Sequence, residues 1–187
     1  MSAKALIVID IQNDYFNGGD WPLVGVEEAA ANAARLLQSA RSADDVVVHI
    51  RHEFESADSP FFRPGSTGAA IHGSVLPTGD EHVVLKHKIN SFLGTDLKQH
   101  LDANDVTEVV ICGNMSHMCV DAATRASADY GYAVTLVHDA CASRDLEFDG
   151  VHVPARMAHA AYMSALGFAY AKTMSTDEYL NLAAQPH

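Results

Sequence analysis

The sequence predicts an α/β fold: a three-layer α/β/α arrangement around a six-stranded, mostly parallel, doubly wound sheet. Six short apolar runs, of the kind that form strands buried on both faces, recur along the chain. Segments with helical periodicity alternate with them, and strands joined through helices become parallel neighbours because the crossover is long. The length of 187 residues suits one domain, which we expect to span residues 1–187.

The first half of the chain contains three of the expected strands, at residues 4–11, 45–51 and 82–86. An alanine-rich helix over residues 27–43 has acids in its first turn and arginines late, and Thr95 can cap a second helix to about residue 103. Residues 52–81 lack a sustained period. Because long ordered loops in compact domains are usually functional, we expect this loop to cover an active site.

The second half continues the alternation, with strands expected at residues 106–112, 132–138 and 168–173. One helix is expected over residues 119–130, with Gly131 as its stop, and another over residues 151–166, ended by Gly167. A short helix follows the last strand. Because ligands collect at the carboxyl ends of parallel strands, residues just after these strands are candidates for a site.

Composition excludes several classes of partner. There are 24 acidic residues against 12 basic ones, the formal charge is −12, and no Lys/Arg run occurs, so nucleic acid and anionic membranes are poor partners. The first residues enter a strand directly without the features of a signal peptide, and no apolar run is long enough to span a membrane. Three cysteines, an odd number, favour a reducing compartment, so we expect a cytoplasmic protein.

Three reactive residues lie at or just after the ends of predicted strands: Asp10, Lys86 and Cys119. Cys119 begins a helical segment, where unpaired N–H groups lower a thiol's pKa and favour a nucleophile. An aspartate could take the thiol proton, a lysine could favour both anions, and backbone N–H groups could stabilise an oxyanion. The alternatives are that Cys119 fills the core, Asp10 caps a loop and Lys86 is a surface charge.

Five segments in order carry a resemblance to a known family: VIDIQNDY, RPGSTGAAIH, KHKINSFLGTDL, GNMSHMCVDAATRASADYGY and HDACASR. From about residue 6 to residue 168 the chain resembles the isochorismatase-like cysteine hydrolases, which include nicotinamidases and N-carbamoylsarcosine amidohydrolases. The resemblance implies Asp10 as general base, Lys86 as electrostatic partner and Cys119 as nucleophile. Lys86 is preferred to Lys88 because it stands six residues before Phe92, as the family pattern K-x-x-x-S-x-F requires, although Asn90 replaces the serine.

The same resemblance implies a nucleophile loop formed by Met115, Ser116 and Met118. A cis peptide bond precedes the small polar residue of this loop in the family, which places it here between Met115 and Ser116. Backbone N–H groups of the loop would stabilise an oxyanion.

Two departures from family patterns narrow the function. Nicotinamidases bind a metal through an Asp-x-His pair after the second strand, where this chain has Arg51-His52-Glu53. Eleven histidines are present without an HxH or HExxH pair, so we expect neither a metal nor another cofactor. Some relatives that cleave vinyl ethers dispense with the cysteine, so Cys119 favours amide or ureide substrates. Arg51 could pair with an acid or clamp a substrate carboxylate.

The substrate is expected to be a small molecule held by residues of the loops around the site. The candidate contacts are Gln12, Tyr15, Phe16, Trp21, Arg63 and His117. For Arg63, both a salt bridge within the fold and a clamp on a substrate carboxylate are open.

The leading hypothesis is hydrolysis of a small amide, ureide or related C–N bond through a thioester on Cys119. One alternative is an isochorismatase-type vinyl ether hydrolase in which Asp10 is an acid. Another is a non-catalytic thiol redox sensor, with Cys112 or Cys141 as resolving thiol, although both look like packing residues. The resemblance also suggests a homo-oligomer, whose interface could include Phe61, Phe62 and residues 157–166, each of which could equally be core.

Overall fold

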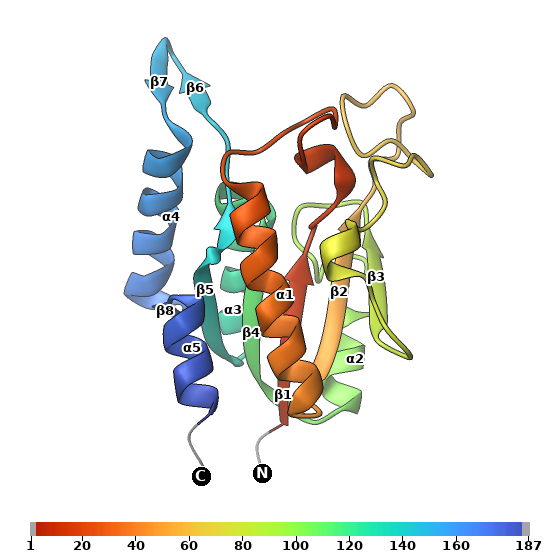
Figure 1. The fold of residues 1–187 in the computed structure, drawn as a ribbon, viewed down its shortest axis with the longest axis vertical. Helices are drawn as coiled ribbons and strands as arrows, with labels where there is room; N and C mark the ends of the chain where they lie inside the picture. Colours follow the sequence, from red (N-terminus) through yellow and green to blue (C-terminus); the bar gives the residue numbers. More distant parts are fainter. Residues whose placement is uncertain (1–2, 185–187) are drawn as a thin grey trace.

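The computed structural model describes residues 3–184 and contains a six-stranded sheet with the order β3-β2-β1-β4-β5-β8 (Figure 1). All five neighbouring pairs in this sheet are parallel. The strands are β1 (Ala3–Ile9), β2 (Val46–His52), β3 (His82–Lys86), β4 (Val106–Asn114), β5 (Ala133–Ala142) and β8 (Lys172–Met174). The predicted fold class is therefore confirmed, down to a sheet wound in both directions from its centre.

Five α-helices cover the two faces of the sheet, and short helical turns occur in the loops. The helices are α1 (Val26–Ser42), α2 (Leu97–Ala103), α3 (Asp121–Asp129), α4 (Ala155–Ala169) and α5 (Thr176–Ala183). The turns are η1 (Asn13–Tyr15), η2 (Gly73–Val75) and the π-helical η3 (Ser116–Val120). Helices α1 and α5 pack on one face, and α2, α3 and α4 pack on the other.

The strand β1 shows why the sheet is buried on both sides. Leu6 and Val8 belong to the core beneath α1, whereas Ala5, Ile7 and Ile9 belong to the core on the opposite face. Successive side chains of a strand point to opposite faces, so a continuous apolar run satisfies two cores at once.

The region around α4 differs from the prediction. Residues 146–153 form an antiparallel hairpin, β6 (Leu146–Phe148) and β7 (Val151–Val153), which projects at the upper left of Figure 1. The predicted helix over residues 151–166 therefore begins later, at Ala155, whose N–H donates to the Asp145 carboxylate at 2.8 Å. A carboxylate at this position satisfies an N–H group that the first turn of a helix leaves free.

The end of α4 was also predicted wrongly. The helix runs through Gly167 to Ala169, and the strand expected at residues 168–173 is reduced to Lys172–Met174. A Cβ on Gly167 would come within 3.0 Å of the Thr173 hydroxyl. This glycine therefore allows a close approach between α4 and β8 and does not stop the helix.

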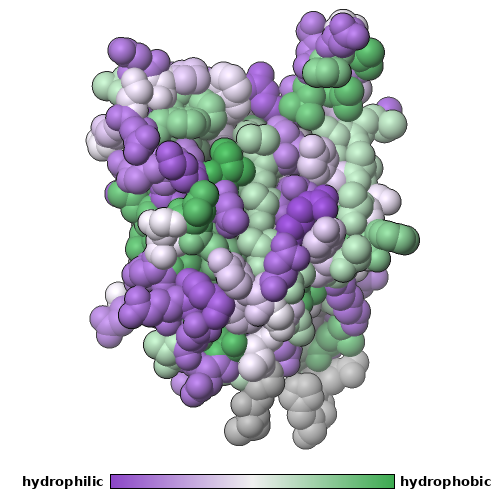
Figure 2. Space-filling view, turned by 180° about the vertical axis from the view of Figure 1, so that it is seen from behind, coloured by the Kyte–Doolittle hydropathy of each residue, from purple (hydrophilic) through white to green (hydrophobic). Residues whose placement is uncertain are grey.

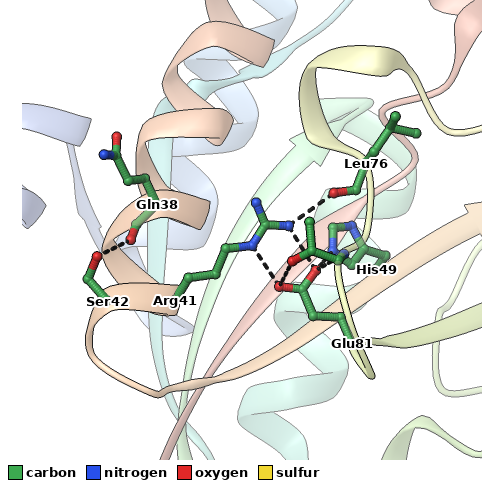
Figure 3. Close-up of polar contacts among 7 residues, drawn as sticks. Gln38, Arg41, Ser42, His49, Leu76 and Glu81 are labelled. Atoms are coloured by element: carbon green, nitrogen blue, oxygen red, sulfur yellow. Dashed lines mark hydrogen bonds and ion pairs between the residues drawn. The ribbon is translucent and has the colours of Figure 1, made fainter.

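The exit of the long loop is anchored to the end of α1, as Figure 3 shows. Arg41 donates from Nε and Nη2 to the two Glu81 carboxylate oxygens, at 2.7 and 2.8 Å, and from Nη2 to the Leu76 carbonyl at 3.0 Å. The buried His49 of β2 reaches the same carboxylate, with Nε2 2.9 Å from Oε2. These contacts fix the last residues of the loop, near Glu81, against α1 and β2.

Figure 2 shows apolar side chains gathered along the side of the molecule that α4 forms. Phe168 is 93% exposed and Met157 is 52% exposed, and residues 157–171 contain no Asp, Glu, Lys or Arg.

Phe61 and Phe62, which were considered as interface residues, are instead buried in the core. Within residues 3–184, no helix has the length and apolar character that a membrane span needs.

Candidate active site

The carboxyl ends of the central strands bring three reactive side chains together. Asp10 follows β1, Lys86 ends β3, and Cys119 lies in the turn η3 after β4. The chain builds the sheet outward from β1 to β2 and β3 on one side, and from β4 to β5 and β8 on the other. The order therefore reverses between β1 and β4, which is where open α/β sheets bind ligands.

The Lys86 ammonium lies between the other two groups. Its Nζ is 2.8 Å from Asp10 Oδ2 and 3.2 Å from Cys119 Sγ. The side chains of Asp10 and Lys86 are 0% exposed, and Cys119 is also buried. The structure thus places the three residues singled out from the sequence in one buried cluster.

The backbone beside Asp10 is tightly constrained. Asp10 has a φ of 48°, in the left-handed region that few residues other than glycine adopt, and its N–H donates to the Ile50 carbonyl at 3.0 Å. Gly113 has a φ of 121°, and a Cβ there would collide with the Ile9 carbonyl. Only glycine allows this approach, so β4 runs close enough to β1 to set the Cys119 turn against Asp10.

Burial decides the protonation of the cluster. Burial raises the pKa of the Cys119 thiol, the charge of Asp10 raises it further, and Lys86 only partly opposes this. Burial disfavours the Lys86 ammonium, but the charge of Asp10 and the contact with the thiol outweigh it and raise the pKa of Lys86. The expectation that the helix start would lower the thiol pKa is therefore wrong. The resting thiol is neutral and needs a base.

The nucleophile loop differs from its prediction by one residue. Its cis peptide bond joins Asn114 and Met115, not Met115 and Ser116. The side chain of Asn114, the last residue of β4, fixes this bend to the end of β5, because its Oδ1 accepts from the Ala142 N–H at 3.1 Å. The buried Ser116 hydroxyl donates to the Ala142 carbonyl at 3.1 Å and thus belongs to the wall behind the loop.

The expected oxyanion donors are only partly free. The Met118 N–H donates to the Met115 carbonyl at 3.0 Å, and the Val120 N–H donates to the same carbonyl at 3.2 Å. The side chains of Met115 and Met118 line the cavity beside the thiol.

A cavity of about 510 Å³ opens beside Cys119 and has mainly aromatic and apolar walls. Three of the predicted substrate contacts line it: Tyr15, Trp21 and His117. The prediction missed His52, Phe54, Phe61, Ile89 and Arg144, and the hairpin residues Asp145, Leu146 and Glu147. The Arg144 guanidinium lies over the Trp21 ring, 3.9 Å from its centroid. Arg144 ends the HDACASR segment, and membership of that segment was the feature of the sequence that could have placed Arg144 at the site.

Known proteins resemble this chain over nearly its whole length. Residues 4–166 match the isochorismatase domain model. The isochorismatase family protein YddQ of Bacillus subtilis is 45% identical over 176 residues, covering 94% of this chain and 98% of YddQ. A crystal structure from Oleispira antarctica, of a protein assigned to the isochorismatase hydrolases, matches with a TM-score of 0.93 at 54% identity, covering 96% of this chain and 97% of that one. The chain belongs to the isochorismatase family.

A further relative of this isochorismatase-family chain is a streptothricin hydrolase of Streptomyces noursei. It is 37% identical over 170 residues, which are 88% of this chain and 59% of that protein. The matches make the chain a hydrolase of the isochorismatase family and confirm the resemblance found in the sequence.

Three of the predicted substrate contacts lie away from the cavity of the isochorismatase-family site. Gln12 is buried, and its Nε2 donates to the carbonyls of His52 at 2.8 Å and Ala69 at 2.7 Å. Phe16 stacks on His72, with ring centroids 3.5 Å apart. Arg63 pairs with Asp20 on the exposed side of the loop, so of its two open roles the structure shows the salt bridge. These side chains hold the loops in place.

The segment where nicotinamidases carry metal ligands has other partners here. Arg51 Nη1 is 2.8 Å from Glu53 Oε1, and His52 Nδ1 contacts the Lys86 ammonium. Across residues 3–184, no three or more His, Cys, Asp or Glu side chains are grouped so that they could hold a metal ion.

Proposed function

We propose that this isochorismatase-family hydrolase cleaves a small amide or ureide through a thioester on Cys119. The observation that carries the proposal is the placement of one buried ammonium 2.8 Å from the Asp10 carboxylate and 3.2 Å from the Cys119 thiol, beside a cavity of about 510 Å³. A nucleophile, a base and a charge partner within contact distance are the parts that acyl transfer requires.

The first half of the reaction forms the thioester. Asp10 takes the thiol proton as Cys119 Sγ bonds to the substrate carbonyl carbon, which is why a neutral resting thiol is compatible with catalysis. Backbone N–H groups of the turn other than those of Met118 and Val120, which donate to the Met115 carbonyl, stabilise the resulting oxyanion. Asp10 then returns the proton to the leaving nitrogen, the C–N bond breaks, and ammonia or an amine departs.

The second half hydrolyses the thioester. Asp10 removes a proton from water, the water oxygen bonds to the carbonyl carbon, and the C–S bond breaks. The acid product leaves, and the proton held by Asp10 returns to Cys119. Lys86 stabilises first the Asp10 carboxylate and then the Cys119 thiolate. Its positive charge offsets whichever of these two groups is negative at that stage.

The walls of the cavity favour a flat, largely apolar substrate with one polar end. Trp21, Phe54 and Phe61 supply aromatic surface, and Arg144 offers a guanidinium to a carboxylate or carbonyl oxygen. The streptothricin hydrolase relative supports hydrolysis as the reaction class. The free Cys112, Cys119 and Cys141 support a reducing, cytoplasmic setting.

The two alternatives have less support. A vinyl ether mechanism has no use for the Cys119 thiol, which lies 3.2 Å from the Lys86 ammonium and lines the cavity. A redox sensor needs a reactive thiolate, whereas burial raises the pKa of Cys119. Cys112 also packs in the core on the opposite face of the sheet, and burial raises the pKa of Cys141 to about 12.

The proposal is tested by trapping the thioester. The enzyme is mixed with a panel of small amides and ureides, quenched in acid, and examined by intact-mass spectrometry and peptide mapping. An acyl adduct on Cys119 that appears and decays during turnover is expected, with none in Cys119→Ala. Turnover of these amides or ureides that persists in Cys119→Ala would refute the thioester.

A further inference from the structure

We infer that His52 is a positioning residue that fixes the direction of the Lys86 ammonium between Asp10 and Cys119. The inference rests on the proposed thiol chemistry but concerns a residue outside those three. His52 is 3% exposed, and its Nδ1 is 3.0 Å from Lys86 Nζ. It lines the cavity from the end of β2, beside the end of β3.

The count of protons and acceptors makes the contact significant. An ammonium has three protons and no lone pair. Lys86 Nζ has an oxygen of Asp10 at 2.8 Å, the imidazole of His52 at 3.0 Å and the sulfur of Cys119 at 3.2 Å. The contacts with His52 and Cys119 are hydrogen bonds and the contact with Asp10 is an ion pair, so three groups that can accept a proton surround the three N–H groups of this buried cation. His52 supplies the third acceptor and leaves the other two N–H groups for the reacting pair.

The imidazole can accept this proton only in its neutral form. Its Nδ1 must be free, so the ring proton is on Nε2, a buried atom that has no hydrogen-bond partner within residues 3–184; the tautomer thus leaves one N–H unpaired in return for the contact with Lys86. Burial and the charge of Lys86 lower the pKa of His52 to about 4, against the smaller opposing effect of Asp10. The lowered pKa agrees with the contact geometry, in which the ring faces an ammonium and can only accept.

The surrounding structure holds the imidazole in place. His52 and Lys86 are direct partners in the parallel β2 and β3 pair. Gln12 brackets the His52 backbone, donating to its carbonyl at 2.8 Å and accepting from its N–H at 2.8 Å. The Phe54 ring meets the imidazole edge to face, with centroids 4.6 Å apart. Such support is how a site fixes a side chain before the substrate arrives.

Loss of this acceptor would disturb the base. Neither carboxylate oxygen of Asp10 has a hydrogen-bond partner within residues 3–184, and Oδ2 is the oxygen in the ion pair with Lys86, which leaves Oδ1 to take the thiol proton. Without His52, the freed ammonium proton turns toward that oxygen, because a buried N–H is costly to leave unpaired. Asp10 would then be a poorer proton acceptor, and the thiolate would lose part of its stabilisation by Lys86.

The test measures Cys119 reactivity without a substrate. Iodoacetamide alkylates Cys119, with the C–S bond forming as iodide leaves and the thiol proton passing through Asp10 to solvent. Rates are followed by intact-mass spectrometry from about pH 5 to about pH 10, with Cys119→Ala as the blank. The variants are His52→Leu, His52→Phe, which retains a ring against Phe54, and His52→Asn, whose amide oxygen can replace Nδ1 as acceptor.

The control is His49→Asn, on the same strand and equally buried but bonded to Glu81 far from the thiol. Several groups besides the imidazole can shape the pH profile. Those that face it or its partners are Asp10, Tyr15, Lys86, His87 and Cys119.

We expect His52→Leu or His52→Phe, whichever folds as judged by circular dichroism, to slow alkylation at least about tenfold and to move the profile to higher pH. His52→Asn should stay within about threefold of the wild type because it restores the acceptor. The inference is overturned if the apolar variants match His49→Asn, or if His52→Asn is as slow as they are.

This outcome is separable from that of the proposed function. If no acyl adduct forms with any amide or ureide but the His52 series behaves as expected, the function fails and the positioning role stands. If acyl adducts form but all His52 variants are alkylated as fast as the wild type, only the role of His52 fails.

Discussion

Replacing Lys86 with methionine tests the buried ion pair at the centre of the site. Methionine keeps an unbranched chain of similar length and removes the charge. At the observed 2.8 Å, two unit charges attract by about 6 kcal/mol at an effective dielectric constant of about 20. Desolvation of two ions, at several kcal/mol each, offsets most of this, so the pair itself contributes little net stability.

The variant nevertheless loses stability because Asp10 is left buried and unpaired. Removing one partner of a buried pair costs about 3–5 kcal/mol, which we expect as the drop in the free energy of unfolding near neutral pH. Asp10→Asn should also destabilise, since it strands the ammonium. The double variant Asp10→Asn/Lys86→Met should lose at least about 2 kcal/mol less than the sum of the two single losses.

Urea unfolding followed by circular dichroism measures these differences. The sign of the pH dependence gives a second check. In Lys86→Met the carboxyl group of residue 10 can bind a proton as the pH falls, which removes the unpaired charge and narrows the deficit relative to the wild type. Strictly additive losses together with a deficit that does not change with pH would refute the reasoning.

The remaining predictions concern turnover, acid stability and assembly. Cys119→Ala should abolish turnover while binding persists, and Cys119→Ser should be nearly as inactive because a hydroxyl is far harder to deprotonate. Asp10→Asn should lower kcat about 10²–10⁴-fold and His117→Ala much less, and steady-state kinetics with the reverse order would make His117 the base. Hydrogen bonding, chiefly from its arginine partner, lowers the pKa of Glu81 from 4.5 to about 2. Glu81→Gln should therefore cost about 2 kcal/mol of unfolding free energy above about pH 4.5, a difference that fades toward about pH 2; a deficit equally large at pH 2 in denaturant titrations would contradict this. If the apolar face of α4 joins two copies, Phe168→Glu should shift light-scattering masses toward the 20.1 kDa monomer, and a wild type already monomeric would rule the interface out.

The sequence predicted the bounds of an element well where polar turns flank it on both sides. The bounds of β3 are those predicted, because residues 82–86 stand between two polar turns. The hairpin before α4 was missed although its turn is Asp149-Gly150, with positive φ at both residues. This dipeptide is a strong hairpin signal. Two three-residue strands are too short to show a period, and the predicted helix was extended back over the second of them, Val151–Val153.

The meeting of Asp10, Lys86 and Cys119 was predictable from the sequence, but most of the residues that line the cavity were not. Asp10, Lys86 and Cys119 follow apolar runs, and parallel strands bring such ends to one edge. His52 was not singled out, because its meaning depends on the register that pairs it with Lys86, 34 residues away. Arg63 and Phe16 were expected at the cavity because of their residue types, which do not reveal the direction of a loop side chain.

The pKa of Cys119 shows where reasoning from sequence reaches its limit. Position on a helical turn predicts a lowered thiol pKa, because N–H groups and the helix dipole favour the thiolate. Burial and the charge of Asp10 act in the opposite direction and prevail. Whether the helix dipole or burial controls the thiol pKa depends on how far the sulfur is shielded from water. That shielding is set by the packing of the strands and loops around it, which the sequence alone does not show. The same packing that keeps the thiol neutral places Lys86 close to both Asp10 and the thiol, so the thiolate should form as the sulfur attacks an electrophile and not in the resting enzyme.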